Sequence, residues 1–352
     1  MNITFLIGNG FDVGMGLRSK FSDYFPRYIE ESAKKTKSLK DLSKRIEENQ
    51  KEWSYFEKKL GEYTEEFTLE TQEIFKQQLR DFELGFIKYL REEEKTLLYD
   101  QQKIKETFSK AFLNYYKNEN LTAGSEETVA NQYSRYNQNN RIYNFINFNY
   151  TDILEKCLAS FPDGLIAKRT VNNMGYVDKL GKVIHIHGYK DKLPLMGVND
   201  ISQIKNKELA EDKRFVRFIV KPLFNKVNRT NYDKQAINLI SNSHIICIYG
   251  MALGETDKDW WKLVLTWLNN EGNRQLVIFN YDEKYDTSSQ FDFLEKEDAV
   301  IDKLSEFVAE EKINVEALRA RIHIAIHKNI FEMNLRKKED DALSEVAATI
   351  VK

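Results

Sequence analysis

Residues 3–12, ITFLIGNGFD, give the clearest indication of the fold. This stretch begins with an apolar run of strand length, residues 3–7, and this run stops abruptly at Gly8, Asn9 and Gly10. A short apolar run that ends in glycines is typical of a buried strand entering a tight turn. When a helix follows such a turn, backbone N–H groups can approach a phosphate at the positive end of the helix. The sequence therefore predicts a first strand, followed by a loop that either binds phosphate or is a plain turn.

This loop departs from the dinucleotide fingerprint of dehydrogenases. The fingerprint requires a third glycine at position 13, where this chain has Val13. It also requires a second strand that ends in an acidic residue about 20 residues further on, but that region has a helical pattern here. The loop therefore favours phosphate binding over hydride transfer.

The composition excludes several classes of protein. The 352 residues include 53 basic and 55 acidic side chains, and a net charge of −2 argues against a dedicated nucleic-acid-binding protein. Two cysteines, Cys157 and Cys247, cannot build a disulfide framework or a four-cysteine zinc site. The sequence shows no signal-peptide pattern and no apolar run long enough to span a membrane. We therefore expect a cytoplasmic protein with no metal and no membrane or nucleic-acid partner.

After the glycine loop the chain becomes helical in character. Residues 17–140 are rich in Lys, Glu, Gln and Leu, and aromatic and apolar residues recur at helical spacing, as in Phe56 and Leu60. This pattern is typical of amphipathic helices whose charged residues face water. We expect Glu57 to lie on such a solvated face, and we expect Lys221 to reach solvent because long basic side chains usually do.

Beyond residue 140, short apolar runs alternate with polar or helical segments. Strands that alternate with helices predict a mainly parallel sheet covered on both faces. Because the first strand is N-terminal and the others follow residue 140, we interpret the helical stretch as an insertion in one α/β domain. The expected strands span residues 142–150, 183–187, 244–249, 275–281 and 322–326. The expected units are a core of residues 1–24 and 141–335, a helical insertion of residues 25–140 and a charged tail of residues 336–352.

Polar residues close the second of these strands, where residues 147–152 read Asn-Phe-Asn-Tyr-Thr-Asp. In open α/β sheets, side chains at the carboxyl ends of strands face the ligand crevice. An amide such as that of Asn147 or Asn149 can hold a sugar hydroxyl or a water without titrating. Asp152 also fits the N-cap of a helix that begins near residue 153.

Two histidines close the next strand, in His185-Ile186-His187-Gly188. Histidine is the usual general base near neutral pH. We interpret His185 as a buried core residue and His187, beside a glycine at the strand end, as the catalytic candidate. The pair lacks the further ligands, at recognisable spacing, that a metal site would need.

A second glycine turn follows a later strand, in Tyr-Gly-Met-Ala-Leu-Gly at residues 249–254. Gly250 and Leu253 lie in this turn, which again suits phosphate. A further strand closes with Asn280, where a ribose or a base could be held. Four strand ends with Gly, Asn, His or Asp chemistry in one domain indicate a nucleotide crevice.

These segments resemble the AbiH family, which is associated with abortive infection of phage-infected bacteria. The resemblance is carried by IGNGFD at 7–12, WSYFEKKLGEY at 53–63, NFNYTD at 147–152, HIHG at 185–188, VKP at 220–222 and GMALGETDKDWW at 250–261. The same order is similar, more distantly, to the sirtuin superfamily, in which such motifs surround NAD. The resemblance implies a sirtuin-like, Rossmann-type α/β fold with a large helical insertion.

The resemblance also implies roles for individual residues. Asn149 would hold the nicotinamide ribose or the attacking water, and His187 would act as a base toward a ribose hydroxyl or that water. The residues expected to bind the cofactor lie at the same strand ends, and they are Gly8, Asn9, Gly10, Phe11, Asp12, Asn147, Asp152, Gly250, Leu253 and Asn280.

Departures from the sirtuin pattern narrow the expected activity. Sirtuin deacylases carry a four-cysteine zinc module, which two cysteines cannot build. Ala252 stands where the distant relatives often have a serine, and the motif NYTD places its Asp one residue later than usual. Nicotinamide in NAD is already a cationic leaving group, so an amide and a neutral histidine suffice for glycosidic cleavage.

The resemblance therefore implies an antiphage NAD glycohydrolase that releases nicotinamide and ADP-ribose. The alternative is a non-catalytic sensor that binds NAD or ADP-ribose and recruits a partner through its helical block. Because a toxic NAD hydrolase must be restrained in healthy cells, a phage-derived trigger and a homo-oligomer are the expected partners.

Overall fold

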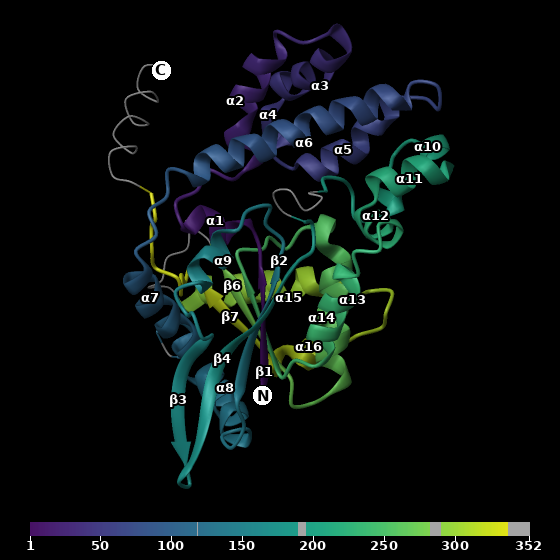
Figure 1. Cartoon of the computed structure of the whole chain (residues 1–352). Helices are drawn as coiled ribbons and strands as arrows, with labels where there is room; N and C mark the ends of the chain where they lie inside the picture. Colours follow the sequence, from purple (N-terminus) through teal and green to yellow (C-terminus); the bar gives the residue numbers. More distant parts are fainter. Residues whose placement is uncertain (118, 189–194, 282–289, 337–352) are drawn as a thin grey trace.

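A mainly parallel sheet lies at the centre of the computed structural model, and helices cover both of its faces (Figure 1). The structure describes residues 1–117, 119–188, 195–281 and 290–336. The strand order is β3-β4-β2-β1-β5-β6-β7, in which only β3 and β4 pair antiparallel. This confirms the predicted α/β class and mainly parallel sheet. The strands are β1 (Asn2–Ile7), β2 (Arg141–Asn147), β3 (Leu165–Val171), β4 (Met174–His185), β5 (Ile245–Tyr249), β6 (Gln275–Asn280) and β7 (Ile322–Ile326).

Two of the predicted strands were wrong in extent. Strand β4 begins at Met174 rather than at residue 183, and it forms a hairpin with β3, which was not predicted. The turn between them places Asn172 and Asn173 at positive φ, 52° and 63°, as two-residue hairpin turns require. Strand β2 ends at Asn147 rather than at residue 150, so Asn149 belongs to the loop that follows the strand.

The described helices are distributed along the whole chain. They are α1 (Asn9–Gly14), α2 (Phe21–Ser32), α3 (Lys37–Glu48), α4 (Gln50–Trp53), α5 (Phe56–Tyr63), α6 (Gln72–Glu94), α7 (Gln101–Asn114), α8 (Ala123–Arg135), α9 (Ile153–Leu158), α10 (Lys207–Glu211), α11 (Lys213–Ile219), α12 (Lys221–Val227), α13 (Tyr232–Ser241), α14 (Lys258–Asn270), α15 (Gln290–Phe307) and α16 (Val315–Leu318). In the described part of the chain, no helix combines the length and apolar character that crossing a membrane requires.

Each face of the sheet buries its own apolar layer. On one face, Phe5 of β1 and Phe145 of β2 contact Phe112 of α7, with ring centroids 5.9 and 5.6 Å apart. On the other face, helices α13, α14 and α15 cover the isoleucines that alternate with those rings, and Trp261 of α14 is buried there. Residues that alternate along a strand point to opposite faces, which explains why these strands are apolar throughout.

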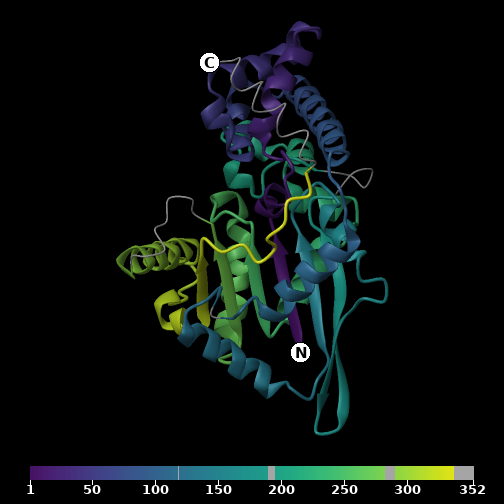
Figure 2. The same cartoon turned by 90° about the vertical axis from the view of Figure 1, so that its left-hand side faces the viewer.

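The stretch predicted as one helical insertion lies in two places. Helices α2 to α6, called the helical lobe below, stand above the carboxyl ends of the parallel strands (Figures 1 and 2). Helices α7 and α8 instead pack on the sheet, as the contact of Phe112 with Phe5 shows. Helix α11 joins the helical lobe, since Phe215 contacts Phe75 at 5.3 Å between ring centroids.

The segment after β7 returns to the N-terminal loop. Phe331 packs edge-on against Phe11, with ring centroids 5.4 Å apart. The N–H of Leu335 donates to the carbonyl oxygen of Met15 at 2.9 Å, and Arg336 Nε donates to the carbonyl oxygen of Gly16 at 2.9 Å. Beyond Arg336, the predicted charged tail lies outside the described residues.

The first glycine loop and the turn after β5 touch backbone to backbone. The N–H of Gly10 donates to the carbonyl oxygen of Gly250 at 2.8 Å. A Cβ atom on Gly10 would lie 2.7 Å from the Cα of Gly250, and one on Gly8 would lie 2.6 Å from the Gly250 oxygen. Gly250 itself has φ of +70°. Glycine is therefore required here for close packing and for a left-handed turn.

Replacement of Gly10 by alanine is expected to destabilise the protein by about 2 kcal/mol, because the added methyl group must push apart two backbones. The matched control is Gly124→Ala in the first turn of α8, where a Cβ would meet no atom within 4 Å. The control should be neutral or slightly stabilising. Urea unfolding of both variants checks this, and equal stabilities would contradict the close-packing account.

Candidate functional site

A cavity of about 580 Å³ lies between the carboxyl ends of the parallel strands and the helical lobe. From β1 the chain forms the neighbouring β2 on one side and, later, β5 on the other. Such a reversal in strand order is where open α/β sheets bind ligands. The sheet supplies a polar floor, which includes Asn149 and His187, and the helical lobe supplies an aromatic roof, which includes Phe21, Phe56 and Phe86.

The structure brings most of the predicted residues to this cavity. Those that line it are Gly8, Asn9, Gly10, Asp12, Asn149, His187, Gly250 and Leu253. The two catalytic candidates therefore share one cavity with the N-terminal glycines, although their loops are far apart in the sequence.

Four predicted residues lie elsewhere. Phe11 is buried against Phe331 on the other side of α1, and Asn280 closes β6 at the far side of β5 from the glycine loop. Asn147 is buried behind the cavity. Asp152 occupies the predicted N-cap position of α9, but its side chain makes no capping hydrogen bond there, and its Oδ1 pairs with Lys156 Nζ at 2.9 Å.

The amide of Asn149 is held from three directions. Its Nδ2 donates to the carbonyl oxygen of Gly8 at 3.2 Å and to Asp12 Oδ1 at 3.1 Å, so both amide hydrogens are in use. Its backbone N–H donates to Asn147 Oδ1 at 3.0 Å. The remaining polar atom, Oδ1, has no hydrogen-bond partner among the described residues. The amide is therefore fixed, with one buried acceptor oxygen that the described residues leave unused.

Asp12 is buried, with 1% of its surface exposed. Besides Asn149, it accepts a hydrogen bond from Thr151 Oγ1 at 2.6 Å. Burial raises the pKa of Asp12 to about 8, against the hydrogen bonds from Thr151 and Asn149, which lower it. The neutral carboxyl is thus the favoured form at neutral pH, which reduces the negative charge on the floor of the cavity.

His187 is 6% exposed and lies between two aromatic rings. Its ring centroid is 5.7 Å from that of Phe148 and 6.1 Å from that of Tyr150. Burial, with smaller contributions from Lys221 and His185, lowers the pKa of His187 well below its ordinary value. The imidazole is therefore neutral, and its Nδ1 has no partner within the described ranges.

His185 has the structural environment that was predicted for it. The residue is buried, with Nδ1 3.2 Å from the carbonyl oxygen of Asn149 and Nε2 in contact with Glu155. These contacts connect the end of β4 to the loop after β2 and to α9. No group of His, Cys, Asp and Glu within the described residues is arranged to hold a metal ion.

The predicted solvation of Glu57 and Lys221 was wrong. Lys221 is 2% exposed, and its Nζ lies 2.5 Å from Glu57 Oε1 in an ion pair between α12 and the helical lobe. Glu57 lines the cavity, as does Asp257 from the turn before α14. Amphipathic patterning could not find this pair, but both residues lie in segments that carry the family resemblance, and that signal could have found them.

The glycine loop offers fewer free donors than a phosphate loop was expected to. The N–H groups of Gly8 and Gly10 already donate to the carbonyl oxygens of Tyr249 and Gly250, at 2.9 and 2.8 Å. The side chain of Asn9 accepts a hydrogen bond from Ser19 Oγ at 2.6 Å. The loop therefore shapes the cavity chiefly through its backbone packing.

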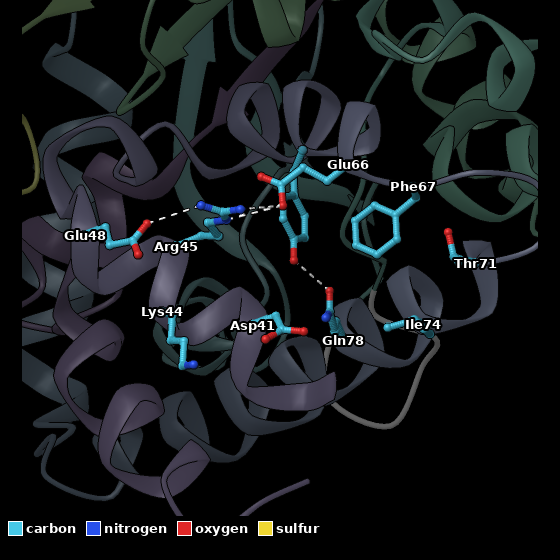
Figure 3. Close-up of a pocket in the computed structure, with 10 residues that line it drawn as sticks. Asp41, Lys44, Arg45, Glu48, Glu66, Phe67, Thr71, Ile74 and Gln78 are labelled. Carbon is cyan, nitrogen blue, oxygen red and sulfur yellow. Dashed lines mark hydrogen bonds and ion pairs between the residues drawn. The ribbon is translucent and has the colours of Figure 1, made fainter. Parts of the chain in front are cut away.

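A second cavity, of about 440 Å³, lies within the helical lobe (Figure 3). Three of its charged side chains form ion pairs, in which Arg45 lies 3.4 Å from Glu48 and 2.9 Å from Glu66. Tyr63 donates to Gln78 Oε1 at 3.0 Å across the same space. Because these polar groups satisfy each other, the cavity above the sheet is the better candidate site.

Replacement of Asp12 by asparagine is expected to stabilise the protein, increasingly so as pH rises. A carboxyl with a folded pKa of about 8 keeps its proton where the unfolded chain has lost it, so wild-type stability falls between about pH 4 and pH 8. The advantage of Asp12→Asn should grow by about 2–3 kcal/mol between pH 5 and pH 7. Urea unfolding at both pH values measures this, and a constant difference would show that Asp12 is ionised in the folded protein.

The comparison with known proteins covers this site. Residues 4–281 match the family model described as "Bacteriophage abortive infection AbiH". No curated protein matches the chain. The matched segment is most of the chain, and it contains every residue that lines the cavity except Lys303. The chain therefore belongs to the AbiH family of bacteriophage abortive infection proteins.

Proposed function

We propose that this protein is an NAD glycohydrolase that serves phage defence, with its active site in the cavity above the sheet. The observation that carries the proposal is the meeting of Asn149 and His187 in one cavity. Each is more than nine-tenths buried, and each has a polar atom without a partner in the described part of the chain. A buried polar group without a partner is costly, and a bound ligand or water in the adjoining cavity would explain both.

The size and lining of the cavity support a nucleotide ligand. Small-molecule sites are typically concave spaces of about 300–1,000 Å³ with apolar walls and few polar groups. The cavity of about 580 Å³ lies in that range. Its aromatic roof suits a flat ring, and its amide and imidazole suit sugar hydroxyls.

The proposed reaction breaks one bond and forms one. The bond between the ribose C1′ and the pyridinium nitrogen breaks, and its electron pair neutralises the nitrogen, so nicotinamide leaves without a general acid. The oxygen of a water forms the new bond to C1′, which gives ADP-ribose, and the proton of that water passes to solvent. Asn149 Oδ1 and the neutral ring of His187 accept hydrogen bonds from the water or the ribose, which places the nucleophile.

Loss of NAD fits the family to which the chain belongs. Abortive infection stops the growth of an infected cell, and depletion of a central redox cofactor would do so. The distant likeness of the motif order to sirtuins, together with the sheet topology around β1, supports NAD over other nucleotides.

The purified protein should convert NAD to nicotinamide and ADP-ribose, with or without a phage-derived activator. Asn149→Ala and His187→Ala should each lower this rate by about 100-fold or more, because the water or the ribose loses a group that positions it. Chromatography of the products measures the rate, and the variants should abolish protection of cells challenged with phage.

The matched control is Asn242→Ala, which removes an exposed asparagine at the end of α13. It should keep the wild-type rate. Binding of NAD with no turnover under any condition, infection included, would contradict hydrolysis and favour the sensor alternative.

A further inference from the structure

One wall of the cavity carries two carboxylates from distant parts of the chain. Glu57 comes from α5 in the helical lobe, and Asp257 comes from the turn between β5 and α14. The ammonium group that pairs with Glu57 belongs to Lys221, which is not one of the described residues that line the cavity. A ligand in the cavity would therefore meet the carboxylates, with the ammonium behind them.

The other charged groups around the cavity do not offset the negative charge of this wall. Lys303 lies 2.5 Å from Glu306 and 3.5 Å from Glu255, so these two carboxylates offset its positive charge. Lys58 also lines the cavity, but its side chain is exposed to solvent. The pKa of Asp12 is about 8, which leaves its carboxyl mainly neutral.

Asp257 keeps its negative charge at neutral pH. Burial and the nearby charge of Glu57 raise its pKa to about 6, while Lys221 and a hydrogen bond from Asn199 lower it. Its Oδ1 lies 3.4 Å from Asn199 Nδ2. The wall therefore presents Asp257 and Glu57 together, with one buried lysine between α12 and the helical lobe to offset them.

The same part of the cavity contains aromatic rings against which a flat ring could pack. The charges of Glu57 and Asp257 act on Tyr150, whose ring lies roughly parallel to that of His187. Phe148 also lines the cavity and contacts His187 edge-on. His187 brings the buried, unpartnered Nδ1 described above. Aromatic faces beside carboxylates favour a cation that is planar.

We infer that Glu57 and Asp257, together with the rings around His187, bind a cationic N-ribosyl ring. The cavity would then select the oxidised dinucleotide, whose pyridinium ring is positively charged and flat, over the reduced form, whose ring is neutral. This inference rests on the proposed function and deepens it. The same carboxylates would stabilise the positive charge that develops on the ribose as the glycosidic bond breaks.

The test uses carbocyclic NAD, which keeps the pyridinium charge but has no glycosidic bond to cleave, and its reduced form. Calorimetry measures the affinity of the full chain for both at neutral pH. The wild type should bind the oxidised form about tenfold more tightly, and Glu57→Gln and Asp257→Asn should each remove most of that preference. In Glu57→Gln, the amide oxygen still accepts a hydrogen bond from Lys221, and Asp257→Asn provides a second variant if the first loses stability.

The matched control is Glu62→Gln on the same helix, whose side chain pairs with Lys59. It should keep the wild-type preference. Equal affinities for the two forms in the wild type, or a preference unchanged by Glu57→Gln and Asp257→Asn, would overturn this inference and leave hydrolysis standing. Charge-selective binding without cleavage of NAD would support it and overturn hydrolysis, and binding of neither form would overturn both.

Discussion

The site depends on one contact between two backbones. Strands β1 and β5 are neighbours, and the turns that follow them pack so closely that Gly8, Gly10 and Gly250 leave no room for a side chain. This contact closes the floor between the two strands and directs the first glycine loop toward β2. The carbonyl oxygen of Gly8 is thereby presented to the amide of Asn149. The three glycines therefore serve mainly to position Asn149 through their backbone contact, rather than to bind phosphate.

A network of buried hydrogen bonds connects the glycine contact to the loop after β2. Asp12 and Gly8 use both hydrogens of the Asn149 amide, and Thr151 holds Asp12 from the other side. The donors of the Asn149 amide are used within the protein, and Asn149 Oδ1 and His187 Nδ1 are buried without a partner among the described residues. Polar atoms left without a partner at these two positions would suit the hydroxyl groups of a ribose or a water. Polar networks in a low-dielectric interior are rigid when they are satisfied, which explains how a loop can hold such precise geometry.

Sequence reasoning succeeded where local pattern decides structure and stopped where distant segments meet. Apolar runs that end in Gly, Asn or His predicted the parallel strands. Because the carboxyl ends of parallel strands meet at one edge of the sheet, the sequence also predicted that Asn149 and His187 lie close together. The hairpin of β3 and β4 was missed because its half-exposed residues lack an apolar signature. The ion pair of Glu57 and Lys221 spans 164 positions and joins two helices, so no periodicity in either segment could reveal it. The position of the helical lobe over the cavity likewise depends on tertiary packing, which the local sequence pattern does not indicate.

The return of the chain to its own beginning has a consequence for biosynthesis. Phe11 of α1 packs against Phe331, and the carbonyl oxygen of Gly16, just after α1, accepts a hydrogen bond from Arg336 that spans 320 positions. The segment around α1 therefore lacks these contacts until nearly all of the polypeptide has left the ribosome. Contacts of such long range form late, because their loop-closure entropy must be overcome first. A nascent chain, or one truncated by a premature stop, would lack the contacts that Phe331 and Arg336 make with the N-terminal segment.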